Sequence, residues 1–271
     1  KSYESAFIIT ARGCPFQCTF CEYRQSGVRK RRIEDIHSEF AVLDGKIERV
    51  FALDLNMPAD KKWTNEFLEK MKESKFKVKW QTDARAGDCT IELLKKFKDA
   101  GCTNMVIGVE SLDDGILEKI RKGTNVAMIK EAISNCRKAG IAPSLSFMIG
   151  FPWDSEETMK NTVKNLKEIA NPSTMTRFVR PNRGTPLYDQ CKEYGLLERD
   201  LTLDDYVKSR HYPIMNTLNM TKKQVYDWDY KIQKAMRVNP KYIWNFVKER
   251  GFKPRYAKRF LKLLLGEHII Q

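Results

Sequence analysis

Short apolar runs alternate with amphipathic helical stretches through most of the chain, and this alternation constrains the fold more than any other feature. The runs that predict strands are rich in Val, Ile and Phe and end in turn-forming residues; they are Ala6–Ala11, Arg49–Leu53, Lys77–Gln81, Asn104–Val109, Pro143–Ile149 and Met175–Val179. Helices are predicted between them at Glu34–Leu43, Lys62–Glu73, Thr90–Ala100, Ala127–Ala139 and Glu156–Ala170. Strand–helix alternation favours a parallel sheet with right-handed crossovers, and these units are fewer than the eight of a closed barrel. We therefore predict an α/β fold, a partial (β/α)6 TIM-like barrel whose chemistry lies on the loops after the strands.

Local signals at helix ends support these boundaries. Gly101 and Gly140 follow predicted helices and are typical C-terminal caps, because glycine tolerates the left-handed conformation. Asp154 and Glu157 fit a capping box at the start of the helix beginning near Glu156.

The pattern changes after about Gly195, where three basic and aromatic stretches predict helices without strands between them. They are Thr221–Arg237, Pro240–Arg250 and Pro254–Leu265, each entered by a Thr or a Pro. From this change of pattern we expect two parts: a partial barrel at residues 1–197 and a basic helical extension at residues 198–271. The aromatic side chains of the extension are expected to pack on the barrel, with contact to a substrate or a membrane as the alternative.

Composition restricts the class of protein. The 271 residues include 7 cysteines, an odd number of which only three are clustered, and this favours a reducing cytoplasm over a secreted disulfide scaffold. No stretch approaches the roughly 20 apolar residues that span a bilayer, and no signal peptide is visible. The net charge of +14 suits an anionic partner, or simply keeps the protein in solution.

Three cysteines follow the first predicted strand in a Cys-x3-Cys-x2-Cys pattern: Cys14, Cys18 and Cys21. Thiolates are the preferred ligands of iron–sulfur clusters, and a compact loop can bind three corners of a 4Fe–4S cube while one iron stays open. A structural zinc site needs four ligands, and His37 is distant and isolated. A thioredoxin-like pair would leave Cys14 unused, and inert buried cysteines are not expected in a loop rich in Gly and Pro. We therefore interpret the triad as a cluster site.

The triad, with the aromatic Phe20 before the last cysteine, resembles the signature of the radical S-adenosylmethionine (SAM) superfamily. The resemblance implies that SAM binds the open iron through its amine and carboxylate. Reductive cleavage would then yield methionine and a 5′-deoxyadenosyl radical, which abstracts a substrate hydrogen. The resemblance also implies an oxygen-sensitive enzyme with an electron donor such as flavodoxin or ferredoxin.

Later motifs extend the resemblance and imply positions that bind SAM. The segment ending in Gly108-Val109-Glu110-Ser111 resembles the fourth strand of the family, so Glu110 and Ser111 would contact the SAM amine or ribose; an acid at the start of the next helix is the alternative for Glu110. Lys122, or less favourably Arg121, would pair with the SAM carboxylate, unless it is a solvated helix charge.

The fifth-strand segment Ser146–Pro152 resembles the family element that faces the adenine. The resemblance implies that Ser146 contacts SAM, that Ile149 forms an apolar wall, and that Gly150 allows the backbone to approach the adenine closely. Asp83 and Arg85 end the third strand, where they would contact SAM or substrate, although ordinary loop charges have the same pattern. No residue pattern identifies a catalytic acid, base or nucleophile.

One departure indicates the subgroup. The Gly-Gly-Glu run that many members carry after the second strand is replaced by Leu53-Asp54-Leu55-Asn56-Met57-Pro58. This resembles the cobalamin-associated group, which often has an Asp-rich loop there. Arg183 stands where Pro is usual in the Gly-Thr-Pro-Leu-Tyr element, which leaves the shape of that loop open. No cobalamin motif occurs in these residues, so cobalamin, if used, implies an upstream cobalamin-binding domain or another chain.

Three functions stay open at this point. The favoured one is cobalamin-dependent methylation, cyclisation or rearrangement of a small-molecule or lipid substrate, expected to be anionic. The second is cobalamin-independent modification of a peptide, RNA or lipid; nucleic acid is not favoured because no RNA-binding module is present. The third is a non-catalytic iron–sulfur electron carrier, which would normally ligate all four irons. The remaining cysteines are predicted to be small buried hydrophobes: Cys89, Cys102, Cys136 and Cys191.

Overall fold

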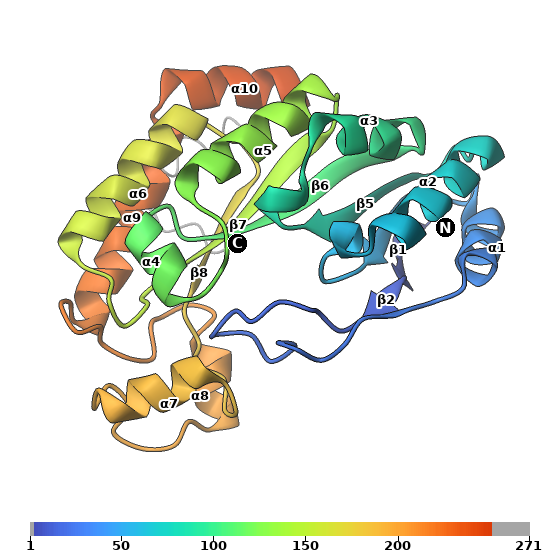
Figure 1. Cartoon of the computed structure of the whole chain (residues 1–271). Coiled ribbons are helices and arrows are strands. Elements are labelled where there is room, and N and C mark those ends of the chain that lie inside the picture. The colour runs from blue at the N-terminus through green and yellow to red at the C-terminus, as the bar shows by residue number, and fades with distance from the viewer. Residues whose placement is uncertain (1–2, 251–271) are drawn as a thin grey trace. The chain divides into compact units, whose positions relative to one another are not determined.

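The computed structural model describes residues 3–250, and its helices and strands alternate along the chain (Figure 1). The strands are β1 (Tyr3–Ile9), β2 (Ala11–Arg12), β3 (Arg29–Lys30), β4 (Ile47–Leu53), β5 (Lys79–Ala84), β6 (Cys102–Glu110), β7 (Ala142–Ile149) and β8 (Thr174–Phe178). The α-helices are α1 (Ile33–Leu43), α2 (Lys61–Ser74), α3 (Ile91–Asp99), α4 (Asp114–Lys119), α5 (Val126–Lys138), α6 (Glu156–Ile169), α7 (Pro186–Glu193), α8 (Leu203–Lys208), α9 (Lys222–Arg237) and α10 (Pro240–Arg250). Two short 3-10 helices, η1 (Met57–Ala59) and η2 (Ala86–Asp88), follow β4 and β5.

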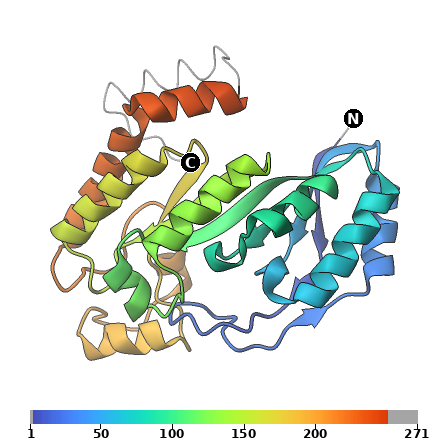
Figure 2. The same cartoon turned by 45° about the horizontal axis from the view of Figure 1, so that its top comes forward.

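A six-stranded sheet has the order β1-β4-β5-β6-β7-β8, which is also the order of these strands in the sequence. The pairings of β1 with β4, β4 with β5 and β5 with β6 are parallel. Helices separate these strands along the chain, as parallel connections require, and Figure 2 shows the same elements from a second direction. The predicted α/β fold class, a partial (β/α)6 TIM-like barrel, is confirmed.

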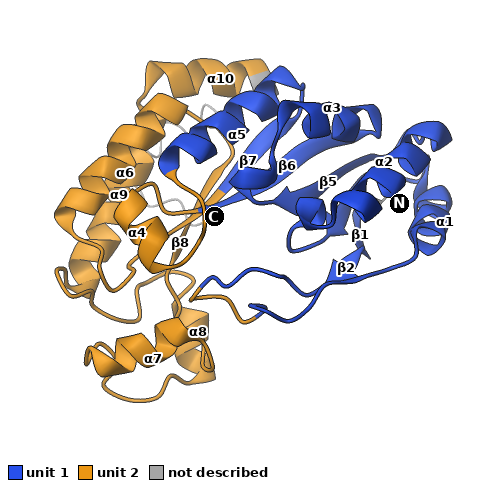
Figure 3. Ribbon diagram, viewed as in Figure 1, with its two compact units in different colours: residues 1–18, 23–109, 126–145 blue, residues 19–22, 110–125, 146–271 orange. Residues whose placement is uncertain are grey.

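Two compact units divide the chain, and both are discontinuous in sequence (Figure 3). Unit 1 contains residues 1–18, 23–109 and 126–145, and unit 2 contains residues 19–22, 110–125 and 146–271. The predicted boundary at residues 197 and 198 rests on the change in sequence pattern, and it stays a proposal.

The core of unit 1 is built around one aromatic side chain of β5. Trp80 is fully buried and packs against Phe40, Phe67 and Phe97, with ring centroids 6.4, 5.6 and 5.8 Å away. Its indole nitrogen donates to the Ala100 carbonyl at 2.8 Å, so the polar atom of a buried Trp is satisfied. This packing holds α1, α2 and α3 against the sheet within the unit.

The helix ends follow the sequence signals with one exception. Gly101 and Gly140 have φ of +90° and +73°, as the predicted caps require. The predicted cap at Asp154 is wrong: Ser155 caps α6 and forms a capping box with Thr158. Asp154 is buried one residue earlier because its carboxylate accepts hydrogen bonds from the backbone nitrogens of Gly150 and Phe151.

The C-terminal helices agree with the sequence as far as the structure describes them. Thr221 caps α9, and Pro240 begins α10. Trp228 is buried as predicted, whereas Trp244 is 70% exposed. The predicted helix Pro254–Leu265 lies outside the described residues. Among the described helices, none combines the length and apolar character needed to cross a membrane.

Candidate functional site

The loop that carries the cysteine triad connects β2 to β3, which pair with each other in antiparallel fashion. Gly13 has φ of +88°, and a Cβ atom at this position would lie 1.7 Å from the Gly27 carbonyl oxygen. Only glycine allows this approach of the two ends of the loop. The Cys14 backbone nitrogen donates to the Ser26 hydroxyl at 3.1 Å, and the Ser26 hydroxyl donates to the Tyr23 carbonyl at 2.7 Å. The first cysteine therefore has a fixed backbone.

The three thiols differ in exposure: Cys18 is buried, whereas Cys14 and Cys21 are half-buried. None of the seven cysteines, all within the described range, forms a disulfide. Among residues 3–250, no three Cys, His, Asp or Glu side chains converge on a point where they could hold a single ion. A 4Fe–4S cluster does not need such convergence, because its thiolates bind separate iron atoms. One buried and two half-buried thiols on a single constrained loop are a donor set that fits such a cluster.

A second element supports the same loop within unit 1. The Arg85 guanidinium lies over the Phe16 ring, with its central carbon 3.4 Å from the ring centroid. The Arg85 backbone nitrogen donates to the Asn56 side-chain oxygen at 3.0 Å, and the Asn56 amide donates to Asp88 at 2.8 Å. Arg85 therefore contacts Phe16, one of the three residues between Cys14 and Cys18, and its role in binding SAM stays a prediction.

The end of β5 also holds Asp83, a half-buried carboxyl. Burial, and secondarily the charge of Asp54, raise the pKa of Asp83 to about 6. Asp54 is itself committed elsewhere, because it pairs with Lys30 at 2.8 Å and accepts from the Thr10 hydroxyl at 3.2 Å. In the loop that stands in place of Gly-Gly-Glu, Asp54 therefore connects the end of β4 to Lys30 of β3.

In unit 2, Glu110 and Lys122 form a buried ion pair. Their charged atoms are 2.8 Å apart, and the two side chains are 13% and 7% exposed. Glu110 is the last residue of β6 and has φ of +61°, while Asp113 caps the next helix. The alternatives of a helix-capping Glu110 and a solvated Lys122 are therefore wrong. The Ser111 side chain accepts from the Asp113 backbone nitrogen at 3.2 Å, which orders the turn between them.

The end of β7 combines a glycine with a buried acid. Gly150 has φ of +92°, and an added Cβ would lie 3.3 Å from the Val225 side chain. Burial raises the pKa of Asp154 to about 7, against the lowering effect of hydrogen bonds from Gly150 and Phe151. Asp154 was not predicted as a site residue, and it fixes the backbone turn that follows the strand. Ile149 is 1% exposed.

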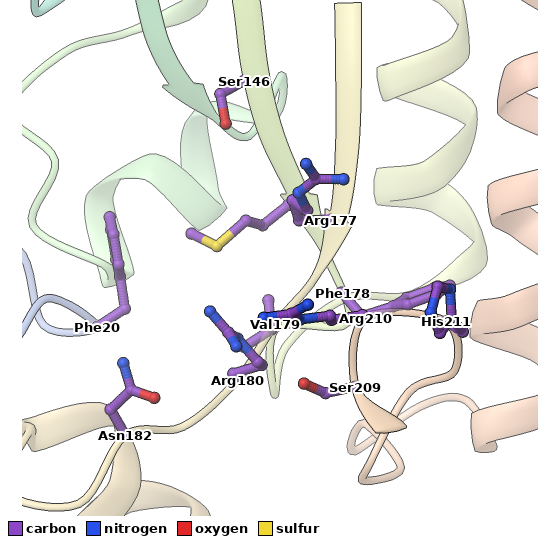
Figure 4. A pocket seen from close by; sticks show the side chains of 11 residues that line it. Phe20, Ser146, Arg177, Phe178, Val179, Arg180, Asn182, Ser209, Arg210 and His211 are labelled. Atoms are coloured by element: carbon purple, nitrogen blue, oxygen red, sulfur yellow. The ribbon is translucent and has the colours of Figure 1, made fainter. Parts of the chain in front are cut away.

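A cavity of about 550 Å³ opens in unit 2 beside the last cysteine of the triad (Figure 4). Phe20, Ser146 and Met148 line one part of it, and the Phe20 ring also contacts the Phe151 ring at 6.2 Å. Since side chains alternate along a strand, Ser146 and Met148 share one face of β7 and Ile149 points to the other. The structure therefore brings Phe20 and Ser146 together, and it does not bring Ile149 to this cavity.

Three arginines and a histidine that the sequence interpretation missed line the same cavity: Arg177, Arg180, Arg210 and His211. Arg177 lies on β8 and Arg180 follows the end of that strand. The sequence signal for these two residues is therefore a pair of arginines at a strand end. Arg210 and His211 follow α8, about thirty residues later in the sequence. No local sequence signal connects them to β8, because the fold alone brings them to the cavity.

The four cysteines outside the triad are buried, as predicted. Burial raises the pKa of Cys191 to about 12 and also raises the pKa of Cys102. The pKa of Cys89 is raised by a hydrogen bond with the Cys136 thiol and by burial. Protonated buried thiols are poor metal ligands, which fits a structural role.

Comparison with known proteins gives relatives with two kinds of activity. The chain is 27% identical to bacteriochlorophyllide d C-8(2)-methyltransferase of Chlorobaculum tepidum, over 92% of this chain and 60% of that protein. It is 29% identical to anaerobic magnesium-protoporphyrin IX monomethyl ester cyclase of Cereibacter sphaeroides, over 94% of this chain and 43% of that protein. The chain spans about half the length of the curated relatives it matches.

A solved structure shows the same fold at low identity. It is the cobalamin-dependent S-adenosylmethionine radical enzyme OxsB with aqua-cobalamin and S-adenosylmethionine bound. The TM-score is 0.69 at 14% identity, over 96% of this chain and 45% of that one. The model of the radical SAM superfamily matches residues 8–166, more than half of the chain. The chain therefore belongs to the radical SAM superfamily of enzymes.

Proposed function

We propose that this chain is the catalytic core of a radical SAM enzyme in which Cys14, Cys18 and Cys21 hold a 4Fe–4S cluster with one open iron. The observation that carries the proposal is the closure of their loop by Gly13 and Ser26, which fixes the backbone at the first cysteine. When bound, the cluster and SAM supply reductive cleavage of SAM and abstraction of a substrate hydrogen. The chain itself binds, orients and shields these groups.

Residues of unit 2 are proposed to seat SAM. Phe20 and Ser146 offer a ring and a hydroxyl at the cavity, and Gly150, which has no side chain, is proposed to let the backbone approach the adenine. Lys122 balances the charge of Glu110, so the pair can accept a zwitterion such as the methionyl group without leaving a buried charge uncompensated. Ser111 orders the turn beside Glu110. Asp83 and Arg85 stay proposed contacts of SAM or substrate, and Arg85 also contacts Phe16 of the cluster loop.

The proposed reaction is cobalamin-dependent methylation, with cyclisation as the variant that the second relative represents. The support for cobalamin comes from the solved relative that binds it and from longer relatives, of which the matched region covers 47% and 54%, which leaves room in them for a cobalamin-binding domain. Further proposed partners are a small-molecule or lipid substrate and an electron donor such as flavodoxin or ferredoxin. Cobalamin-dependent transfer of a labelled methyl group from SAM would test this finer assignment.

The experiment that tests the proposed function is reductive cleavage of SAM. Protein reconstituted anaerobically with iron and sulfide, then given dithionite and SAM, is expected to release 5′-deoxyadenosine and methionine. Cys18→Ala is expected to abolish both iron loading and release, because one cluster ligand is lost. Cys191→Ala removes a buried thiol outside the loop and is the matched control. Cluster-loaded protein that neither binds nor cleaves SAM would contradict the proposal.

A further inference from the structure

The cavity in unit 2 has an unusual charge balance. Arg177, Arg180 and Arg210 line it together with His211, and no Asp or Glu is among the described residues that line it. Figure 4 shows Phe20 on one side of the open space and Arg177 and Arg180 across from it. Three permanent positive charges therefore share one concave surface.

Three other arginines of the chain, unlike these, pair with carboxylates. Arg31, Arg183 and Arg199 each pair with a carboxylate: Glu39 at 2.5 Å, Asp200 at 3.6 Å and Asp205 at 2.7 Å, respectively. By contrast, the guanidinium groups of Arg177, Arg180 and Arg210 form no ion pair or hydrogen bond with any residue in the range 3–250. Like charges around one cavity repel each other, so their arrangement favours an anion between them.

The chemistry of the lining indicates the kind of anion. A guanidinium presents a planar set of donors that matches carboxylate and phosphate oxygens two at a time. Asn182 adds a polar side chain and Met148 provides apolar surface for the remainder of a ligand. Phe20 and Ser146, which also line the cavity, are the residues proposed to contact SAM. Small-molecule sites commonly combine apolar walls with a few such polar groups.

We propose that this cavity is a substrate subsite that binds a polyanionic group, a phosphate or a pair of carboxylates, through Arg177, Arg180 and Arg210. The inference rests on the proposed function, since it takes the cavity beside Phe20 as the substrate side of the SAM enzyme. The single carboxylate of SAM does not account for the cluster, because one anionic group leaves two of the three charges unbalanced. Lys122, the proposed partner of the SAM carboxylate, is not part of this lining.

The test uses two probes on the cluster-loaded full chain: inorganic pyrophosphate for the phosphate source and succinate for the dicarboxylate source. Calorimetric titration is expected to give a Kd at or below about 1 mM for one of them, and the tighter probe identifies the source. Saturating SAM is expected to leave this binding in place. Displacement of both probes by SAM, or failure of both to bind, would overturn the inference.

Variants locate the binding. Arg177→Gln and Arg180→Gln are each expected to raise the Kd of the tighter probe about ten- to a hundredfold, since a hydrogen bond to a charged group contributes about 1.5–3 kcal/mol. Arg32→Gln removes the same charge from an exposed residue paired with Asp35 and is the matched control. Equal weakening in all three variants would attribute binding to net charge alone and overturn the site.

The outcome is separable from that of the proposed function. Release of 5′-deoxyadenosine is measured on the unmodified protein without either probe. Normal SAM cleavage with no probe binding overturns the subsite and leaves the enzyme assignment standing. Probe binding that depends on Arg177 and Arg180, together with no SAM cleavage, supports an anion site and overturns the enzyme assignment on which its role as a substrate subsite rests.

Discussion

At the scale of single residues, the buried pair of Glu110 and Lys122 has a large expected effect on stability. Both charges are largely removed from water, and the distance between them is 2.8 Å. A buried pair contributes little net stability by itself, but loss of one partner leaves a charge in a poorly solvated place. The pair therefore constrains which substitutions the end of β6 tolerates.

Lys122→Met is expected to lower the free energy of unfolding by about 3–5 kcal/mol, because Glu110 loses its counter-charge. Adding Glu110→Gln to that variant is expected to recover part of the loss. Lys160→Met, which breaks an exposed pair with Glu156 at 3.9 Å, is expected to cost less than about 0.5 kcal/mol. Urea unfolding of the variants measures these differences, and equal costs at Lys122 and Lys160 would contradict a buried pair.

Asp83 gives the second prediction at this scale, a dependence of stability on pH. Its pKa in the folded protein is raised to about 6, chiefly by burial. Between pH 4 and pH 6 the unfolded chain has released this proton while the folded chain retains it, so stability falls as pH rises. Asp83→Asn is expected to remove this fall in the free energy of unfolding, which amounts to at most about 3 kcal/mol. The difference in unfolding free energy between the two proteins should grow from pH 4 to pH 6 and then level off; a constant difference would contradict the raised pKa.

At the scale of elements, the loop between β2 and β3 depends on the close approach of its ends. Gly13→Ala would place a Cβ atom 1.7 Å from the Gly27 carbonyl oxygen, so the loop must open. We expect this variant to lose most of its iron after anaerobic reconstitution. Gly45→Ala is the matched control, since it has φ of +72° with nothing within 4 Å, and it is expected to cost only about 1–2 kcal/mol for the left-handed backbone. Iron content per chain decides the outcome, and full loading of the Gly13 variant would contradict this role of the loop.

The elements also show what local sequence does and does not determine. The six strands and their intervening helices were predicted because apolar periodicity persists over each of them. The short helices α4, α7 and α8 were missed, since each is too short to show a clear period. Asp154 was predicted to cap α6, but Ser155 does so. The Asp154 carboxylate instead accepts hydrogen bonds from the backbone of Gly150 and Phe151, a role that local spacing does not reveal.

At the scale of the whole molecule, the sequence predicted the family and did not predict a substrate. The spacing of the triad and the strand-end motifs pointed to the family, which the match over residues 8–166 shows. Glu110 and Lys122 were predicted separately, and the fold pairs them. The arginines of the cavity were missed because β8 and the segment after α8 meet only in the folded chain. Ile149 points to the face of β7 opposite Ser146, and its contact with the adenine of SAM stays a prediction.

The central claim is that Cys14, Cys18 and Cys21 bind a 4Fe–4S cluster and leave one iron for SAM. The most direct measurement is the electron paramagnetic resonance spectrum of the reduced, anaerobically reconstituted protein, recorded with and without SAM. We predict a reduced-cluster signal that changes when SAM is added, and that is absent from Cys18→Ala but retained in Cys191→Ala. A cluster signal that SAM leaves unchanged would mean that the protein ligates every iron, as in an electron carrier, and would contradict the account.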